Sequence, residues 1–187
     1  MSAPVGRLPR AQRREQILDA ATRAFSRAGF TATGLDDVAA EAGVSRVILY
    51  RHFESKTDLY RAVLQRACAR LEASVGSGDY DEGSVPALLD AAAADPDGFR
   101  LLFRHAAREP EFRDVVDGLR AASTEVARAH LAEVIPEGPW RDWAVELVPT
   151  VALEAVLAWL DAEQPEPERA AERVARAIGG VVRAATG

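Results

Sequence analysis

The side chains of this sequence that could do chemistry are arranged for binding rather than for catalysis. Asp36 and Asp37 are adjacent in a stretch with a helical pattern, where neighbouring side chains point about 100° apart, so the two carboxylates do not converge on one atom. The sequence shows no Ser/His/Asp set, no group of residues at metal-ligand spacing and no glycine loop that would cradle a phosphate. We therefore expect no catalytic residue, no bound metal and no cofactor.

Residues Thr33 to Phe53 instead have the layout of two short helices joined by a tight turn. Gly34 and the carboxylates after it suit a helix start, because acidic side chains stabilise the positive end of the helix dipole. Gly43 suits the left-handed backbone of a helix end, and Ser45 offers a new N-cap for a second helix over residues 46–50. This layout is that of a helix-turn-helix, whose second helix is the candidate DNA reader.

The same stretch closely resembles the N-terminal domain of the TetR-type transcriptional regulators. The resemblance rests on AGVSR at residues 42–46, LYRHF at residues 49–53, SK at residues 55–56 and LY at residues 59–60, all at the spacing of that family. It implies a sequence-specific DNA-binding regulator, commonly a repressor that a small molecule controls.

The resemblance also implies roles for individual residues of the reader. Arg46 would contact a base in the major groove, because guanidinium pairs bidentately with guanine, and Tyr50 would contact a phosphate or a thymine methyl. His52 and Lys56 resemble phosphate contacts of the family. The complete predicted DNA-binding set is Thr33, Ser45, Arg46, Val47, Tyr50, His52 and Lys56.

Three features depart from the family pattern. Val47 and Ile48 stand where the family often has a small or hydroxyl residue, and Gly34 stands where it usually has Ser or Thr. At Asp36 some relatives carry a basic residue; its carboxylate either stabilises the helix start or accepts a hydrogen bond from a cytosine amine. The operator sequence therefore does not transfer from the family.

The composition predicts an all-α protein. Hydrophobic residues make up 48% of the 187 residues, alanine is abundant, and no run alternates as a strand would. Proline and glycine signals divide the chain into about nine helices. We expect a flexible basic arm at residues 1–9, a three-helix DNA-binding domain at 10–56 and, by the resemblance, a larger effector-binding and dimerisation domain at 57–187.

The charge is distributed unevenly along the chain. Residues 1–70 hold twelve Lys and Arg against seven Asp and Glu, whereas residues 71–187 hold eleven against twenty-two. The net charges are therefore +5 and −11, which together give the −6 of the whole chain. Positive charge lies with the candidate reader, as phosphate binding requires. The early arginines could contact DNA, but a solvated surface is the favoured interpretation; they are Arg7, Arg10, Arg13 and Arg14.

Apolar periodicity and breaker residues predict the remaining helices. Their expected bounds are about 11–28, 56–75, 84–95, 110–134, 140–162 and 167–185, with a further helix from Pro96 and a loop at 76–83. Pro149 either kinks or interrupts its helix. Arg100, Arg104 and Arg108 form a stripe on the helix from Pro96, which we interpret as a solvated face.

The setting predicted for the chain is the cytoplasm, with association to the nucleoid. Cys68 is the only cysteine, so no intrachain disulfide forms, and we expect a buried thiol. No signal peptide or membrane span is expected, because the most apolar late stretch, residues 147–160, is interrupted by proline, threonine and glutamate.

The resemblance supplies two further expectations. The last two helices would pair with their copies in a homodimer that binds a pseudo-palindromic operator; the alternative is that they only complete the monomer core. The larger domain would bind a small apolar or aromatic effector. The candidate lining residues, which also fit an ordinary core, are Phe99, Phe103, Phe112, Trp143 and Trp159.

Two other classes of protein are compatible with parts of the sequence. A ligand-binding or protein-interaction module of the same fold, without specific DNA binding, is kept open by Gly34, Val47 and Ile48. A small helical enzyme is disfavoured, because the chemistry-bearing side chains do not converge.

Overall fold

A computed structural model describes residues 8–75 and 84–187. Arg7 and most of the predicted arm, and the loop predicted at residues 76–83, lie outside the described residues. The described part is helical and holds no strand, which confirms the all-α prediction. Its α-helices are α1 Arg10–Ala32, α2 Leu35–Ala42, α3 Arg46–Tyr50, α4 Lys56–Val75, α5 Ser84–Ala94, α6 Pro96–Arg100, α7 Arg113–Val134, α8 Pro139–Asp161 and α9 Pro167–Thr186.

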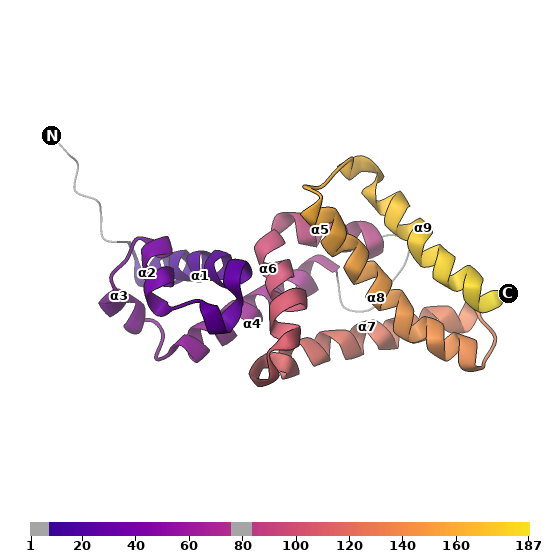
Figure 1. Cartoon of the computed structure of the whole chain (residues 1–187), viewed down its shortest axis with the longest axis horizontal. Helices are drawn as coiled ribbons and strands as arrows, with labels where there is room; N and C mark the ends of the chain where they lie inside the picture. Colours follow the sequence, from indigo (N-terminus) through magenta and orange to yellow (C-terminus); the bar gives the residue numbers. More distant parts are fainter. Residues whose placement is uncertain (1–7, 76–83) are drawn as a thin grey trace.

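The helices form an elongated molecule (Figure 1). The first three helices lie at one end, α4 leads away from them, and α5 and α6 occupy the middle. The long helices α7, α8 and α9 form the other end, where the C-terminus lies beside the α7–α8 connection. The candidate reader and the last two helices are thus far apart.

The first hydrophobic cluster is built around aromatic rings from distant parts of the chain. Phe25, Tyr60 and Phe112 are fully buried in it, with ring centroids 4.8 Å apart for Phe25 and Tyr60 and 4.5 Å apart for Tyr60 and Phe112. Phe30 packs against the same rings. Because this cluster joins α1–α4 to the segment before α7, it spans the predicted boundary at residue 56, and the division into domains stays a prediction.

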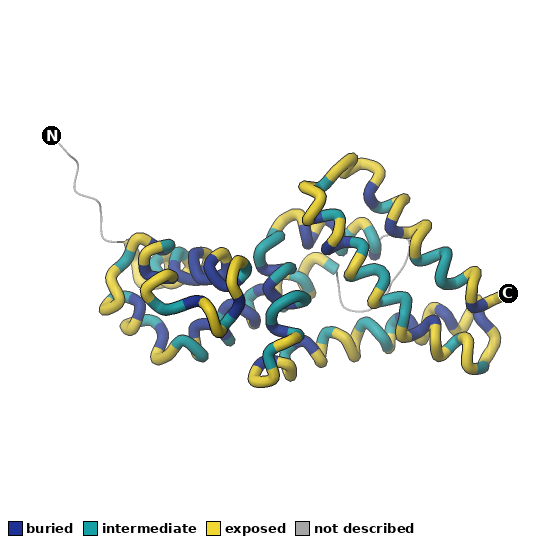
Figure 2. Tube along the Cα trace, in the orientation of Figure 1, coloured by how far each residue is buried: buried dark blue, intermediate teal, exposed yellow. Residues whose placement is uncertain are grey.

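Two smaller clusters hold the other helices together. One contains Leu89 of α5, Phe99 of α6, Val156 of α8 and Val174 of α9. The other lies at the far end, where Leu131 and its neighbours on α7 pack against the start of α8 and the end of α9. Figure 2 shows that exposed and half-buried positions predominate along α8 and α9.

Some helix ends differ from the sequence prediction. The first helix was expected to stop at Gly29, and the helical backbone is interrupted there, because Gly29 has φ 73°, a value that favours glycine; a further helical segment after this kink extends α1 to Ala32. After α6 the chain continues as a π-helical turn, Leu101–His105, and two 3-10 turns, Ala106–Arg108 and Pro110–Phe112. Pro149 does not interrupt its helix, because α8 runs through it.

The sequence suggested that the stripe of Arg100, Arg104 and Arg108 is a solvated face, but two of these arginines make ion pairs within the chain. Arg104 and Arg100 both pair with the carboxylate of Asp161. Nε of Arg100 lies 3.2 Å from a carboxylate oxygen of Asp161, and Arg100 also donates to the carbonyl of Leu160 at 2.9 Å. The hydrogen bond from Arg104, together with that from Arg100, holds the pKa of Asp161 below its ordinary value. Two of the three arginines therefore attach the α6 region to the end of α8.

Among the described helices, α8 is long and apolar enough to cross a membrane by length and composition. In this structure it packs between α7 and α9 instead, and buried residues such as Val145 and Leu157 contribute to the cores on either side. A helix of a soluble helical bundle has the same composition.

Candidate nucleic-acid interface

The two helices of the helix-turn-helix are fixed by local backbone contacts. Gly34 precedes α2, and its N–H donates to a carboxylate oxygen of Asp37 at 2.7 Å. Gly43 ends α2 in the left-handed region at φ 62°, ψ 34°. Ser45 caps α3, because its hydroxyl oxygen accepts from the N–H of Ile48 at 3.4 Å. The amide of Gln16 donates to the carbonyl of Ala42 at 2.8 Å and so attaches α1 to the turn.

One side of α3 faces the core and the other faces solvent. Leu49 is fully buried and Ile48 packs against the first cluster. On the opposite side Val47 is 63% exposed and Tyr50 is 48% exposed, beside the exposed Arg46. The three predicted contact residues of the recognition helix therefore share one solvent-facing surface.

The guanidinium of Arg46 is held on both sides. One nitrogen lies 3.2 Å from a carboxylate oxygen of Asp36 on α2, and another donates to the hydroxyl of Tyr50 at 3.4 Å. The same guanidinium lies over the Tyr50 ring, 5.8 Å from its centroid. Asp36 thus contacts Arg46, the residue predicted to read a base. The sequence did not predict this contact, which joins residues ten positions apart.

The predicted phosphate contacts lie where α3 leads into α4. Lys56 sits over the Phe30 ring, 4.4 Å from its centroid, and its ammonium lies 3.5 Å from the carbonyl of Thr31. His52 is half-buried; its pKa lies below the ordinary value, first because of burial and then because of nearby positive charge from Arg10, Arg14 and Arg13.

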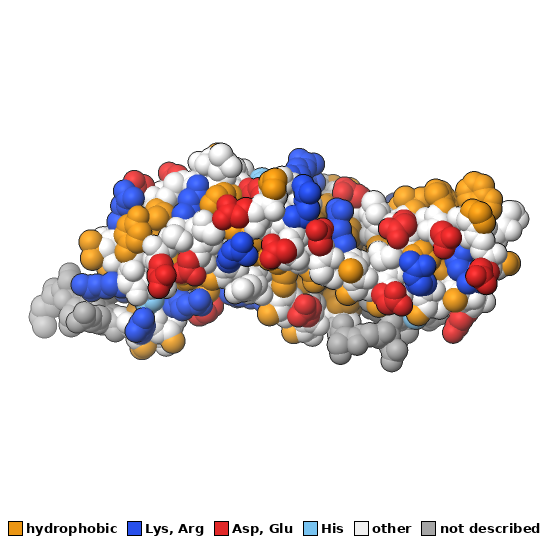
Figure 3. All heavy atoms as spheres, turned by 90° about the horizontal axis from the view of Figure 1, so that it is seen from below, with side chains coloured by type: hydrophobic (Ala, Val, Ile, Leu, Met, Phe, Trp, Pro, Cys, Tyr) orange, Lys and Arg blue, Asp and Glu red, His pale blue; other side chains and the backbone are white. Residues whose placement is uncertain are grey.

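Those three arginines are functional candidates that the sequence interpretation left as solvated charge. The start of α1 lies near the segment that follows α3: Arg14 lies over the Phe53 ring, 5.0 Å from its centroid. A basic run was visible in the sequence, but its position next to the recognition helix depends on the fold. Figure 3 shows basic side chains mixed with acidic ones at this end of the molecule.

Thr33 does not belong to the exposed face. Its side chain is buried, with 3% of the residue exposed, and its hydroxyl donates to the carbonyl of Gly29 at 2.8 Å. It stabilises the kinked end of α1 and has no free hydroxyl for a phosphate. The other six predicted DNA-binding residues are exposed or half-buried.

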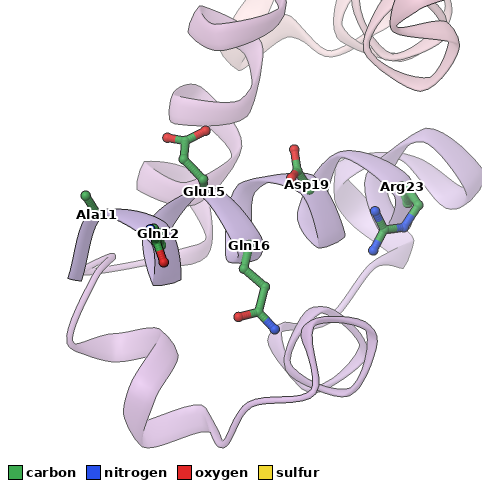
Figure 4. A pocket seen from close by; sticks show the side chains of 6 residues that line it. All are labelled: Ala11, Gln12, Glu15, Gln16, Asp19 and Arg23. Atoms are coloured by element: carbon green, nitrogen blue, oxygen red, sulfur yellow. The ribbon is translucent and has the colours of Figure 1, made fainter. Parts of the chain in front are cut away.

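Ion pairs hold α1 against its neighbours. Glu41 of α2 accepts from Arg23 at 2.8 Å and from Arg27 at 2.6 Å, and these hydrogen bonds lower its pKa. Arg66 of α4 pairs with Asp19 at 2.8 Å and with Glu15 at 3.2 Å. A hollow of about 520 Å³ runs along this part of α1 (Figure 4), and because all its lining residues come from one helix it is a surface groove.

The five aromatic residues predicted to line an effector pocket do not lie together. Phe99, Phe103 and Trp159 belong to or pack against the second cluster, with the two phenylalanine rings 4.8 Å apart. Phe112 is part of the first cluster, because the turn before α7 packs its ring against those of Phe30 and Tyr60. Trp143 is 39% exposed at the far end. Phe112 and Trp143 therefore lie apart from the other three candidates, and the assignment of an effector pocket to these residues stays a prediction.

A second hollow, of about 390 Å³, lies between α8 and α9. Of the predicted aromatic residues only Trp159 lines it. The indole N–H donates to the carbonyl of Pro165 at 3.0 Å, and Arg173 pairs with Glu166 at 2.6 Å at the same hollow. It is thus a partly open, mainly apolar hollow with a polar edge rather than an enclosed aromatic cavity.

No constellation for catalysis or metal binding is present in the described residues. They contain no group of three or more His, Cys, Asp or Glu that could hold a metal ion. Cys68 is half-buried, and burial raises the pKa of its thiol to about 11, so it is protonated at neutral pH. Nε2 of His105 lies 2.9 Å from the carbonyl of Ser26 in a contact between helices.

A capped helix-turn-helix with a solvent-facing recognition helix, carried on an all-helical body, defines a DNA-binding transcription regulator. Comparison with known proteins agrees with this class. The family model described as "Bacterial regulatory proteins, tetR family" matches residues 17–63. The transcriptional activator FasR of Mycolicibacterium smegmatis is 33% identical over 178 residues, which cover 85% of this chain and 77% of FasR.

Shorter and structural matches point the same way. The transcriptional repressor SCO4008 of Streptomyces coelicolor is 36% identical over 89 residues, 47% of this chain and 46% of that protein. A TetR-like regulator from Rhodococcus sp. RHA1 has the same fold, with a TM-score of 0.76 at 24% identity over 92% of this chain and 96% of that one. The chain belongs to the tetR family of bacterial regulatory proteins, and it is a regulator rather than an enzyme.

Proposed function

We propose that the protein binds a pseudo-palindromic operator as a homodimer and that a small apolar or aromatic molecule controls this binding. The observation that carries the proposal is the exposed face of α3, where the Ser45 cap and the Gln16 contact hold Arg46, Val47 and Tyr50 toward solvent. His52 and Lys56 flank this face, and Arg10, Arg13 and Arg14 extend it. Such a face fits the major groove, with basic groups toward the phosphates on either side.

The homodimer is supported by exposed apolar surface at the far end of the molecule, where α7 ends and α8 begins. A reader of five residues contacts few base pairs, so a two-fold arrangement is needed for useful specificity. At the far end Val134, Trp140 and Trp143 are exposed to solvent at 57%, 62% and 39%. Hydrophobic side chains also gather at that end in Figure 3. We propose that α8 and α9 bury this apolar surface against a second copy.

The direction of control follows from where the operator lies. We propose repression, through an operator that overlaps a promoter, in line with the related repressor SCO4008. Activation is the second candidate, because FasR, which matches most of the chain, is named an activator. A promoter reporter with and without the protein distinguishes the two by the sign of its response.

The effector would act through the α6 region. Phe99 belongs to the second cluster and Phe103 packs against it. The turns that follow them contact α1 and α4: Glu109 accepts from the N–H of Phe30 at 2.8 Å and from the hydroxyl of Tyr60 at 2.5 Å. Burial and then this carboxylate raise the pKa of the Tyr60 hydroxyl, so it stays a donor. A ligand that moves α6 would therefore change the positions of α1 and α4.

The location proposed for this regulator is the cytoplasm, at the nucleoid. Operator binding requires access to DNA, and the apolar residues of α8 serve contacts with α7, α9 and the second copy. Imaging of a fluorescent fusion would support this if the signal follows DNA, and a membrane-bound signal would contradict it.

The test of the proposed function is selection of bound sites from random duplex DNA, with enriched sequences measured again at two salt concentrations. We expect a two-fold-symmetric motif. Arg46→Ala and Tyr50→Ala should weaken operator binding, whereas Arg120→Ala, which removes an exposed arginine of α7, should not. Weak, salt-sensitive binding without a motif would instead favour the ligand-binding or protein-interaction module.

Control by an effector is tested separately. Calorimetry against a library of hydrophobic small molecules should find a binder that changes operator affinity, with a coupling free energy of about 1–3 kcal/mol. A library without any binder, or a saturating binder that leaves operator affinity unchanged, would contradict this part of the proposal.

A further inference from the structure

We propose that Asp36 is a specificity-determining residue that positions Arg46 for base recognition without itself reading a base. The inference rests on the proposed function, because it concerns how the recognition helix discriminates between bases. Asp36 lies in the first turn of α2, and Arg46 is the first residue of α3. The contact therefore connects the two helices of the helix-turn-helix across ten residues of sequence.

The guanidinium of Arg46 is restrained from two directions. The carboxylate of Asp36 holds one terminal nitrogen at 3.2 Å, and the hydroxyl and ring of Tyr50 hold the other side at 3.4 Å and 5.8 Å. Guanidinium has five N–H donors, and these two contacts occupy one each. The remaining donors suffice for a bidentate contact with guanine.

Positioning matters because a free arginine loses much rotamer freedom when it binds a base. A side chain that is already held loses less rotamer freedom on binding. Its N–H donors also keep a fixed geometry, so they cannot rearrange to form hydrogen bonds with a different base. In water the Asp36–Arg46 pair is weak, since the side chains are 73% and 52% exposed. The Tyr50 contacts add to the restraint of Arg46 in the free protein, and DNA that excludes water from the pair strengthens the interaction between the charges further.

The carboxylate also acts on phosphates. An exposed negative charge beside the reader repels the DNA backbone and so lowers affinity for every sequence. Asp36 should therefore reduce non-specific binding while it sharpens discrimination at one base pair. Removing the Asp36 side chain should therefore raise the affinity for non-specific DNA and lower the discrimination at one base pair. A role of Asp36 in helix stability alone would not produce this combination.

The neighbouring Asp37 provides a matched control. Its carboxylate accepts from the N–H of Gly34 at 2.7 Å and so caps α2, whereas Asp36 contacts Arg46. Both residues are exposed, and both lie in the first turn of α2. Replacing either removes one negative charge from the same surface, but only one replacement frees the guanidinium.

The experiment uses the full chain and the operator selected by the wild-type protein. Affinities are measured for that operator, for every single-base substitution of one half-site and for an unrelated duplex of equal length. The variants are Asp36→Ala, Asp37→Ala, Arg46→Ala and the double variant Asp36→Ala with Arg46→Ala. Circular dichroism checks that each variant folds.

The base pair read by Arg46 is the one at which Arg46→Ala loses discrimination. There, Asp36→Ala should lower discrimination by about 2- to 10-fold, the range expected for ordering one long side chain. It should strengthen binding to the unrelated duplex, and it should have no further effect on discrimination in the double variant. Asp37→Ala should leave discrimination at that base pair unchanged.

Four results would overturn the proposal while the proposed function stands. They are an equal change of affinity for all sequences in Asp36→Ala, a loss of discrimination at a different base pair, the same loss in Asp37→Ala, or no base-specific effect of Arg46→Ala. A loss at a different base pair would mean that Asp36 reads a base directly. If the wild-type protein selects no motif, the proposed function itself fails and this inference fails with it.

Discussion

The two ends of the molecule are built differently. Around the reader, large aromatic side chains are completely enclosed: Phe25, Tyr60 and Phe112 have no exposed surface. At the far end the third cluster consists mainly of alanine, valine and leucine, while Trp140 and Trp143 stand outside it and pack on each other with centroids 5.7 Å apart. The reader end thus completes its own core, whereas the far end keeps its largest apolar side chains in solvent.

This contrast indicates that the two ends of the chain have different roles. A recognition helix of five residues needs a rigid support, and enclosed aromatic packing supplies it. Exposed tryptophans beside long apolar helices instead suit association with another molecule. The turns between α6 and α7 join the two kinds of structure, because they provide Glu109 and Phe112 to the reader's core.

The largest effect should come from the enclosed aromatic core. Phe112→Ala removes a fully buried ring that contacts Phe30 and Tyr60, so the free energy of unfolding should fall by about 3–5 kcal/mol. Urea unfolding followed by circular dichroism measures this change. Trp140→Ala at the far end should lower the stability of the monomer by less than about 0.5 kcal/mol. Equal losses at the two ends would contradict the contrast.

The second prediction concerns association at the far end. Replacing Trp140 and Trp143 together by alanine should weaken the homodimer by about 2–4 kcal/mol, because exposed tryptophans commonly dominate interfaces. Sedimentation equilibrium over a range of concentrations measures the dissociation constant. Tyr50→Ala removes an exposed aromatic at the reader end and should leave association unchanged. A dimer that withstands loss of both tryptophans would place the interface elsewhere.

The third prediction tests the connection between the ends. Glu109→Ala leaves the fully buried Tyr60 hydroxyl and the Phe30 N–H without their acceptor, which should reduce stability by about 1–3 kcal/mol. Thermal unfolding measures the loss, and operator binding with effector shows whether control is also weakened. Glu111→Ala is the matched control, because its side chain is exposed. Loss of stability with unchanged effector control would make Glu109 a structural contact only.

Local signals in the sequence predicted the reader and the helix bounds. The predicted helix at residues 56–75 agrees with α4, and Gly43 and Ser45 end and start their helices as expected, because caps and breakers act over a few residues. Contacts between distant residues were not predictable in this way. The pairing of Asp161 with Arg100 and the burial of Phe112 beside Tyr60 both join positions about fifty to sixty residues apart.

In the candidate DNA-binding site, too, the sequence did not predict contacts that depend on how the helices pack. Arg46, Val47 and Tyr50 were assigned to the contact face through the resemblance to the family, and all three are exposed on α3. Thr33 was misplaced because its hydroxyl is used by the kinked end of α1, and the kink depends on Gly29 adopting a positive φ. The approach of Arg10, Arg13 and Arg14 to His52 depends on how α1 packs against the segment between α3 and α4, which no local pattern encodes.

The smallest predicted effect is a dependence of operator affinity on pH through His52. In the free protein, burial and the three nearby arginines hold the pKa of His52 below its ordinary value of 6.5, so the ring is neutral at pH 7. A DNA phosphate beside the ring would favour the charged form and raise this pKa. Binding then takes up a proton, and affinity should rise as the pH falls through the interval between the bound and free pKa values.

The size of this effect is bounded by one proton, which is at most tenfold in affinity for each pH unit, and we expect about 2- to 5-fold between pH 8 and pH 6. Fluorescence anisotropy with the operator at constant salt measures it. His52→Gln should remove the dependence, whereas His130→Gln, on the exposed surface of α7, should keep it. Affinity that does not change with pH in the wild-type protein would show that no phosphate approaches His52, and the contact face would then end at Tyr50 and the arginines of α1.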